Sequence, residues 1–239
     1  MTSATAVATA AMTAATSAAT AAAPKAAVSA VVKQKRALRK QIRAALTSQP
    51  ADARALASRQ IATHLLALPA WQAAHHVAIF LSMAHEVDTA PLVQAAFDQG
   101  KRVYVPVITG QAMAMVQLRD QSDYATLPKD AWGIPTPSDP ENRVHAGLAE
   151  NEAVLDLVVT PGVAFDRTGR RIGYGKGYFD RFFTSKTNLE TTTRVAVAFA
   201  DVQLVDEVPT EDHDLRVHAI ATDKGVIDCR GSATASDSA

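Results

Sequence analysis

The stretch HVAIFLSMAHEVDTAPLVQAAFDQGKRVYVPV, residues 76–107, decides the fold class. Its opening HVAIFL is short, rich in strand formers and apolar, as expected of a strand that is covered on both faces. Residues 89–100 predict a helix with Thr89 at its N-cap and Gly100 just past its end. Residues 101–107 predict a second strand. A strand, a helix and a strand in this order indicate a right-handed parallel crossover.

The sequence on either side of this unit predicts more of the same class. Residues 32–68 show two amphipathic repeats separated at Pro50, which predict a helical pair. The second of these helices is expected to bury Leu56, Ile61, Leu65 and Leu68. Further strands are predicted at residues 112–118, 154–162, 194–200 and 217–222, the last of these being the final strand. The pattern indicates an α/β protein.

The composition limits the classes of function. The chain has 239 residues, of which 48% are hydrophobic and 20% charged, as in a globular protein with one sizeable core. The 24 Lys and Arg residues balance the 24 Asp and Glu residues, so no overall field favours nucleic acid. The one cysteine, Cys229, allows no internal disulfide, which fits a reducing compartment.

The ends of the chain differ from the rest. Residues 1–31 are nearly all Ala, Thr and Ser, which predicts a disordered low-complexity tail, with a fraying alanine-rich helix as the alternative. This tail lacks the patterns of a secretory signal, a mitochondrial transit peptide or a membrane span. We therefore expect one domain over residues 32–230, a short disordered tail over residues 231–239, a cytoplasmic location and no membrane partner.

A second informative stretch is RRIGYGKGYFDRFF, residues 170–183. It places Gly173, Gly175 and Gly177 between a predicted strand and a predicted helix. Glycine allows positive φ and close approach to a ligand, and the free N–H groups of such a loop and of the following helix attract anions. The loop therefore predicts a phosphate site, and a tight turn that merely needs glycine is the alternative.

Charged side chains strengthen the phosphate interpretation. Lys176 adds a point charge and Arg171 a forked donor, while Asp180 offers an oxygen to a hard cation such as Mg²⁺. The spacing matches neither the P-loop nor the Rossmann fingerprint, because no glycine stands six residues before the lysine and GYGKG reads G-x-G-x-G.

With these residues the chain resembles the 5-formyltetrahydrofolate cyclo-ligase family, whose members are also called methenyltetrahydrofolate synthetases. The resemblance is carried by DLVVTPGVAFDRTGRRIGYGKGYFDRFF and, in the family's order, by KRALRK, FLSMAHEVDT, WGIPTP and VPTEDHDLRVHAIAT. It implies a three-layer α/β/α fold with a mostly parallel central sheet. It also implies an ATP- and Mg²⁺-dependent ring closure that turns 5-formyltetrahydrofolate into 5,10-methenyltetrahydrofolate, with release of ADP and phosphate.

The resemblance assigns site residues as well. The implied catalytic residues are Lys176, Arg171 and Tyr178. The implied ATP contacts are Lys35, Arg39, Arg171, Ile172, Gly173, Tyr174, Gly175, Lys176, Gly177, Tyr178 and Phe179. The implied folate contacts are Leu81, Glu86, Trp132, Tyr174, Gly175, Lys176, Gly177 and Tyr178. The implied magnesium carboxylates are Asp180 and Asp214.

Each of these residues also has a plainer interpretation. Lys35 and Arg39 could form a solvated basic helix face, and Glu86 could be an exposed loop residue. Trp132 could stack on the pterin or fill the core. Asp214 could belong to a solvated acidic turn, because isolated carboxylates seldom define a metal site.

The chain departs from the family's pattern at two positions. Phe179 stands where many members carry tyrosine, which removes at most a hydroxyl. Tyr174 stands where some members carry arginine, which changes the expected contact with the polyglutamate tail or the phosphate.

Two other functions compete with the cyclo-ligase. One is a regulator that binds folate or nucleotide without turnover, and the other is a small-molecule kinase with an unusual phosphate loop. The presence of Lys176, Asp180 and Glu86 favours the enzyme. We expect a monomer whose partners are small molecules, 5-formyltetrahydrofolate and ATP.

Overall fold

The computed structural model describes residues 30–146, 153–184, 191–211 and 214–231. Within these residues, one large sheet is formed by β1 (His76–Ile79), β2 (Arg102–Thr109), β3 (Ala112–Gln117), β4 (His145–Ala146), β5 (Leu157–Thr160), β8 (Thr193–Ala198), β9 (Ala219–Thr222) and β10 (Gly225–Asp228). The strand order is β10-β9-β8-β5-β1-β2-β3-β4. A separate two-stranded hairpin pairs β6 (Ala164–Phe165) with β7 (Arg171–Ile172).

The centre of the sheet is parallel and its edges are antiparallel. Strand β1 pairs in parallel with β2 and with β5, and the parallel pairing continues through β8 to β9. Strands β3 and β4 on one side and β10 on the other pair antiparallel. The predicted parallel crossover over residues 76–107 is therefore confirmed. The prediction that residues 217–222 form the final strand is wrong, because β10 follows and pairs back on β9.

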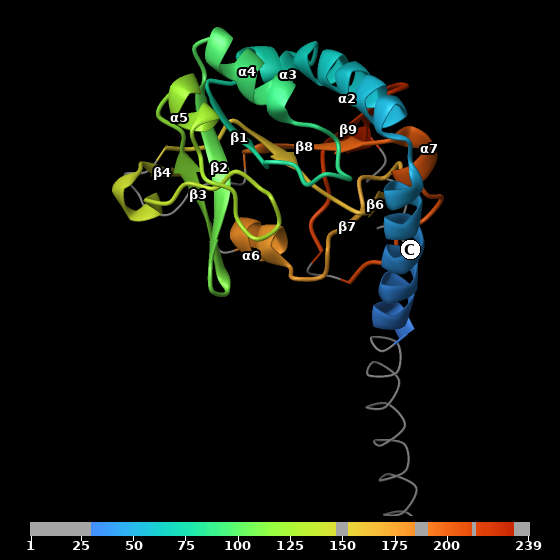
Figure 1. Ribbon diagram of the computed structural model, residues 1–239. Coiled ribbons are helices and arrows are strands. Elements are labelled where there is room, and N and C mark those ends of the chain that lie inside the picture. Colours follow the sequence, from blue (N-terminus) through green and yellow to red (C-terminus); the bar gives the residue numbers. More distant parts are fainter. Residues whose placement is uncertain (1–29, 147–152, 185–190, 212–213, 232–239) are drawn as a thin grey trace, which may run out of the picture.

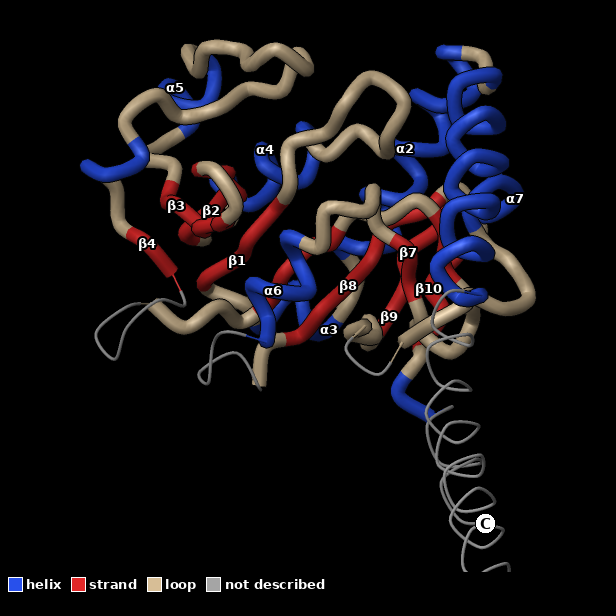
Figure 2. The backbone as a smooth tube through the Cα atoms, turned by 90° about the horizontal axis from the view of Figure 1, so that it is seen from below, coloured by secondary structure: helices blue, strands red, loops and turns tan. Residues whose placement is uncertain are grey.

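Helices cover both faces of the sheet. The chain is helical over residues 30–48, and then in α2 (Ala51–Leu66), α3 (Pro69–Ala73), α4 (Ala90–Asp98), α5 (Gln121–Ala125), α6 (Tyr178–Thr184) and α7 (Ala200–Gln203). A 3-10 turn lies at Pro140–Asn142. Figures 1 and 2 show α2, α3 and α4 on one face of the sheet and α6 on the opposite face. This three-layer α/β/α arrangement confirms the predicted fold class.

The alternating direction of side chains along each strand explains why helices pack on both faces of the sheet. In β1, Val77 and Ile79 pack in the core that contains the side chains of α2 and α4, whereas Ala78 packs with Phe182 of α6. Successive residues of a strand point to opposite faces, so a continuously apolar strand is buried on both sides.

The N-terminal helical pair, residues 30–48 and α2, is confirmed with one correction. Ile61 and Leu65 of α2 are buried as predicted, but Leu56 is exposed. Pro50 lies at the break between the two helices and forms the N-cap position of α2. Residues 30 and 31, which the sequence assigned to the tail, are helical. Most of the two predicted tails lies outside the described residues.

Thr89 marks the start of α4 but does not cap it through its side chain. Its hydroxyl donates instead to the Phe80 carbonyl at 2.7 Å, while the carboxylate of Asp88 accepts the Ala90 N–H at 3.0 Å. Thr89 therefore ties the start of the helix to the end of β1, where the chain turns toward the predicted folate residues. No helix in the described part of the chain combines the length and apolar character needed to cross a bilayer.

Candidate active site

The glycine loop, residues 173–177, starts from a rigid base. It follows β7 of the hairpin, in which Arg171 and Ile172 are buried. The Val163 N–H donates to the Ile172 carbonyl at 2.6 Å, and the buried Asp166 carboxylate accepts hydrogen bonds from backbone N–H groups of the hairpin turn. This hairpin, which was not predicted from the sequence, holds the loop between the central sheet and α6.

Two glycines of the loop have backbone angles that other residues rarely adopt. Gly175 has φ of +96° and Gly177 has φ of +64°, whereas Gly173 lies outside this region. A Cβ atom on Gly175 would lie 3.6 Å from Cζ of Arg39, and one on Gly177 would lie 3.0 Å from Nη1 of Arg181. The loop thus turns tightly against arginine side chains, which fits the predicted anion site.

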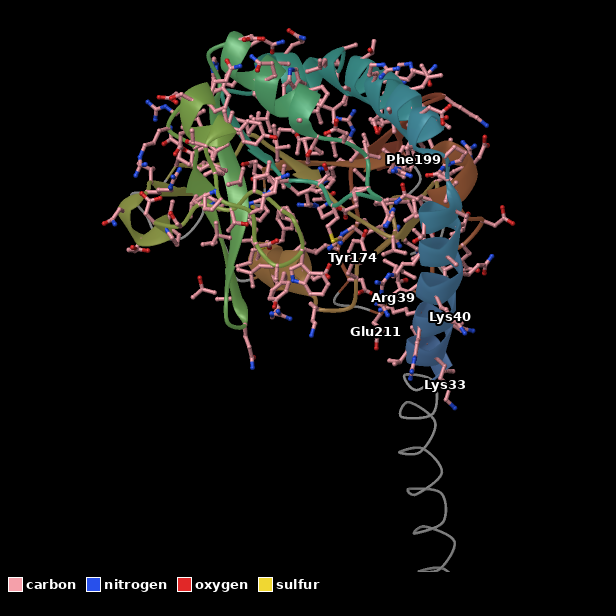
Figure 3. All side chains as sticks on the ribbon, in the orientation of Figure 1. Lys33, Arg39, Lys40, Tyr174, Phe199 and Glu211 are labelled. Atoms are coloured by element: carbon pink, nitrogen blue, oxygen red, sulfur yellow. The ribbon has the colours of Figure 1, made fainter. Side chains whose placement is uncertain are left out.

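The helix over residues 30–48 contributes two cations to the loop. Arg39 Nε donates to the Gly173 carbonyl at 2.8 Å. Lys35, whose side chain is only 7% exposed, places Nζ 2.7 Å from Glu211 Oε2 and 2.5 Å from Asp214 Oδ2. A solvated basic face therefore does not describe Lys35. In Figure 3, Arg39 lies near Glu211, while Lys40 lies on the far side of the helix.

A cavity of about 410 Å³ lies between this helix, the loop and the segment before β9. Its lining gathers most of the charged residues that were predicted to contact ATP or magnesium. They are Lys35, Arg39, Arg171, Asp180 and Asp214, together with Gly173, Gly175 and Gly177 of the loop. Chain segments far apart in sequence thus form one polar cavity, which we call the nucleotide cavity.

The carboxylates of the nucleotide cavity are each paired with a cationic side chain. Asp180 Oδ1 accepts a hydrogen bond from Arg171 Nη2 at 2.6 Å, and Asp214 and Glu211 pair with Lys35. Among the described residues, no group of three or more His, Cys, Asp or Glu side chains is arranged to hold a metal ion. The available donors are oxygens, which suit Mg²⁺ when phosphate and water complete its coordination. The residues therefore fit a magnesium–nucleotide complex.

A second cavity, of about 330 Å³, adjoins the first. The two share Arg171, Gly173, Gly177 and Asp180, so the loop forms a common wall. The lining is largely apolar and includes Phe80, Leu81, Met83, Pro106, Ile108, Met113, Ile134, Tyr174, Tyr178 and Phe179. We call it the apolar cavity. Its size and lining are typical of a site for a planar organic ligand.

Glu86 is the carboxylate of the apolar cavity. Its Oε2 accepts the Met83 N–H at 2.8 Å, and burial raises the pKa of its carboxyl group. Hydrogen bonds from Met83 and from the Tyr174 side chain act in the opposite direction on this pKa. Glu86 is therefore half-buried and held in place, which argues against an ordinary exposed loop residue.

The other predicted residues in and beside the loop each line one of the two cavities. Lys176 is exposed, lines the apolar cavity and has no ion pair with any described residue. The Tyr178 hydroxyl donates to the Gly110 carbonyl at 3.3 Å, which attaches α6 to the turn between β2 and β3. The Phe179 ring lies under the Arg171 guanidinium, 5.8 Å from its Cζ. Ile172 lines the nucleotide cavity from β7.

Trp132 has a different position from the other folate-side residues. It is 77% exposed, so it does not fill the core. It lines a third cavity, of about 430 Å³, that also includes Met83 and Glu86 but not the glycine loop. Trp132 therefore lies beside the apolar cavity, not within it.

Several lining residues were not predicted individually. Asp130, Ile134 and Thr136 reach the apolar cavity from the irregular segment after α5. Two of them belong to WGIPTP, a motif from which only the tryptophan was selected. Glu211 completes the contacts of Lys35, and the Arg43 Cζ lies 5.8 Å from the centre of the Tyr174 ring. No signal in one sequence identifies these two partners, because both contacts join distant segments.

Comparisons with known proteins point to one family. A model of the 5-formyltetrahydrofolate cyclo-ligase family matches residues 31–223. The 5-formyltetrahydrofolate cyclo-ligase of Mus musculus is 32% identical over 190 residues, which cover 78% of this chain and 92% of the mouse protein. The Escherichia coli K12 protein of the same name is 33% identical over 165 residues, covering 69% and 86% of the two chains.

A solved structure is also similar. The 5,10-methenyltetrahydrofolate synthetase of Aquifex aeolicus, determined by NMR, superposes with a TM-score of 0.67 at 26% sequence identity. The match covers 82% of this chain and 93% of the Aquifex chain. The fold of this chain thus recurs in a protein named for folate chemistry.

Proposed function

The chain belongs to the 5-formyltetrahydrofolate cyclo-ligase family, and from this membership we propose that it converts 5-formyltetrahydrofolate into 5,10-methenyltetrahydrofolate, using ATP as phosphoryl donor. The observation that carries the detailed proposal is the common wall of the two cavities. A reaction between a nucleotide and a folate needs both ligands beside the same few atoms. Arg171, Gly173, Gly177 and Asp180 border both cavities, so they define where such atoms would meet.

The proposed chemistry solves a leaving-group problem. The formyl oxygen of the substrate is amide-like and leaves poorly. It attacks the γ-phosphorus of ATP, the bond from that phosphorus to the β,γ-bridging oxygen breaks, and ADP departs. N10 of the folate then uses its lone pair to attack the activated formyl carbon and loses its proton. Phosphate leaves with the former formyl oxygen, and the five-membered methenyl ring remains.

The nucleotide cavity would receive the triphosphate. Backbone N–H groups of the loop around Gly175 and the guanidinium of Arg39 can contact phosphate oxygens. Arg171 is already held by Asp180 at the common wall, where it can face the transferring group. Lys176 lines the adjoining apolar cavity, from which it can neutralise charge on that group. Phosphoryl transfer depends chiefly on such positioning and neutralisation.

The apolar cavity would receive the pterin. Leu81, Tyr174 and Phe179 offer flat or branched apolar surface to its rings. Glu86 is the one carboxylate near β1 that lines this cavity, and an ionised carboxylate can accept the paired N–H groups of the pyrimidine edge. The formyl group would then point toward the common wall. Binding at both ends fixes the distance between formyl oxygen and γ-phosphate.

Magnesium is part of the proposal. Asp180 and Asp214 would hold it, with Glu211 close by in the same cavity. When bound, Mg²⁺ would neutralise phosphate charge and orient the triphosphate. Lys35 keeps Asp214 in position from the helix side. Asp180 and Asp214 would therefore act on the nucleotide and its metal ion, not on the folate.

The decisive experiment supplies purified protein with 5-formyltetrahydrofolate, ATP and Mg²⁺ at neutral pH and follows the absorbance of the methenyl product together with free phosphate. We expect both signals to rise in equal amounts, and both to require ATP and Mg²⁺. A folded protein that binds both ligands without either signal would be a regulator. Formation of a stable phosphorylated folate without ring closure would indicate a kinase.

A further inference from the structure

Arg143 is a buried cation at the β3 edge of the sheet, just before β4. Its side chain is only 3% exposed. Nη1 and Nη2 donate to the two carboxylate oxygens of Asp123 in α5 at 2.6 and 2.8 Å, and Nε donates to Oδ1 of Asp139 at 2.8 Å. Nη1 also donates to the Gln117 carbonyl at the end of β3, at 3.3 Å. One guanidinium is thus fixed to the sheet and paired with two carboxylates.

The two carboxylates stand at opposite ends of one loop. Residues 126–138, which we call the 126–138 loop, follow α5 and its Asp123, and lead to Asp139. The more exposed Arg119 makes a further ion pair with Asp139. Fixing both ends of a loop at one point reduces the number of conformations that the loop can adopt. Bidentate pairing adds direction to this attachment, because the guanidinium and the carboxylate of Asp123 are both planar.

The tip of the 126–138 loop is ordered by its own hydrogen bonds. Asp130 Oδ1 accepts the N–H groups of Trp132 and Ile134 at 2.8 and 2.9 Å. The Thr136 N–H donates to the Pro128 carbonyl at 2.8 Å. Ile134 also packs against the main hydrophobic core. A tip with this internal structure moves largely as one unit, so its place over the sheet depends on how its ends are held.

The 126–138 loop contributes to the folate side of the candidate site and not to the nucleotide side. Asp130, Ile134 and Thr136 line the apolar cavity. Lys129 and Trp132 line the third cavity beside it. Among the described residues that line the nucleotide cavity, none belongs to this loop. A displacement of the loop would therefore change the apolar cavity and leave the nucleotide cavity as it is.

We propose that Arg143 is a positioning residue for folate binding: by joining Asp123 to Asp139, it holds the 126–138 loop in place as one wall of the apolar cavity. This role rests on the proposed function. Arg143 lines none of the three cavities, so it acts through Asp130, Ile134 and Thr136 and not by touching the ligand.

The test uses Asp139→Asn, which releases one end of the loop and keeps the bidentate pair of Arg143 with Asp123. Asp139 is the less buried of the two partners, so the variant should fold. The steady-state KM for 5-formyltetrahydrofolate should rise about tenfold, because a loop that is in place in about one molecule in ten binds that much more weakly. The KM for ATP and kcat should change by less than about twofold, because the nucleotide cavity keeps its lining.

Asp201→Asn is the matched control. It is the same substitution and breaks another ion pair, that of Asp201 with Lys224, in which both side chains are exposed. Asp201 lines none of the three cavities, so both KM values should equal those of the wild type. A folate KM that is unchanged in Asp139→Asn would overturn the inference. A joint change of kcat and of both KM values would do the same, because it would indicate a general effect on the fold.

Proteolysis measures the position of the loop without any assay of activity. Lys129 is exposed within the 126–138 loop, so a lysine-specific protease can cut after it when the loop opens. Mass spectrometry follows this one cleavage. In the absence of ligand, Asp139→Asn should be cut about tenfold faster than the wild type and Asp201→Asn at the wild-type rate. A raised folate KM without faster cleavage would also refute the positioning role.

Failure of this inference can be distinguished from failure of the proposed function. Titration of the wild-type protein with 5-formyltetrahydrofolate in a calorimeter provides the distinction. If the wild type binds the folate and Asp139→Asn binds it equally well, only the positioning role is overturned. If the wild type does not bind the folate, the proposed function falls and takes the positioning role with it.

Discussion

Nζ of Lys35 lies 2.5 Å from Oδ2 of Asp214, which joins the helix over residues 30–48 to the segment before β9 across 179 positions of the sequence. Lys35 makes a second contact with Glu211 at 2.7 Å, and all three side chains line the nucleotide cavity. One lysine therefore has two effects. It holds the helix on the body of the protein, and it orients carboxylates where the nucleotide and its metal would bind.

Lys35→Gln should lower both stability and nucleotide affinity. Removing one partner leaves two largely buried carboxylates without their cation, so the free energy of unfolding should fall by about 2 to 3 kcal/mol. Urea denaturation measures this change, and the KM for ATP should rise in the same variant. Lys33→Gln removes an exposed charge from the same helix and should change neither value. Equal effects of the two substitutions would contradict the role of Lys35.

Lys176→Ala should affect catalysis alone. The side chain is exposed and makes no ion pair with a described residue, so its loss should leave the unfolding midpoint unchanged. A positioned charge that acts on the transition state is worth about 100-fold or more in kcat. The assay is methenyl formation under saturating ATP and folate. Lys224→Ala removes a lysine outside the three cavities and should retain full activity; near-native turnover of Lys176→Ala would show that this charge is dispensable.

Gly177→Ala and Gly100→Ala form a matched pair. Their φ values, +64° and +68°, impose similar strain on an alanine, so each variant should lose about 1 kcal/mol of stability. Only Gly177 borders the two cavities, and its new Cβ would press on Arg181 Nη1, which donates to the Lys176 carbonyl at 2.7 Å. Gly177→Ala should therefore lose most activity and Gly100→Ala none. Similar activities in both would mean that loop shape is unimportant.

Folate binding should weaken in mild acid. Burial raises the pKa of Glu86, so its carboxyl group takes up a proton at a higher pH than an exposed glutamate, and the neutral form accepts the pterin N–H groups poorly. As pH falls from neutral, the folate KM should rise. The Tyr174 hydroxyl lowers this pKa, so Tyr174→Phe should move the rise to higher pH. Glu86→Gln serves as control, and a rise that persists in it would assign the effect to another group.

The fold could be predicted from the sequence in segments where the local pattern of apolar residues agrees with the burial of those residues in the structure. The strand, helix and strand over residues 76–107 have the lengths, apolar runs and helix ends that determine their structure largely independently of context. Strands β6 and β7 were missed because two-residue strands carry no periodic signal. Strand β10 was missed because it alternates between half-buried and exposed residues, and its pairing depends on β9. Leu56 was misplaced because the apolar face of α2 starts one turn later than the pattern of leucines suggests.

The residues of the glycine loop could be predicted from the sequence, but the contacts between distant residues of the site could not. The glycines, Lys176 and Asp180 are adjacent in sequence, so one motif indicates them together. The pairing of Lys35 with Asp214 depends on how the helix lies across the sheet, which a single sequence does not encode locally. The position of Trp132 could not be derived either, because a tryptophan in an irregular segment is compatible with a core or a surface position.

The common wall has a practical consequence for ligand design. Since the two cavities share Arg171, Gly173, Gly177 and Asp180, one compound that links a pterin analogue to a phosphonate could occupy both at once. Such a bisubstrate inhibitor would bind without the entropic cost of bringing two separate molecules together.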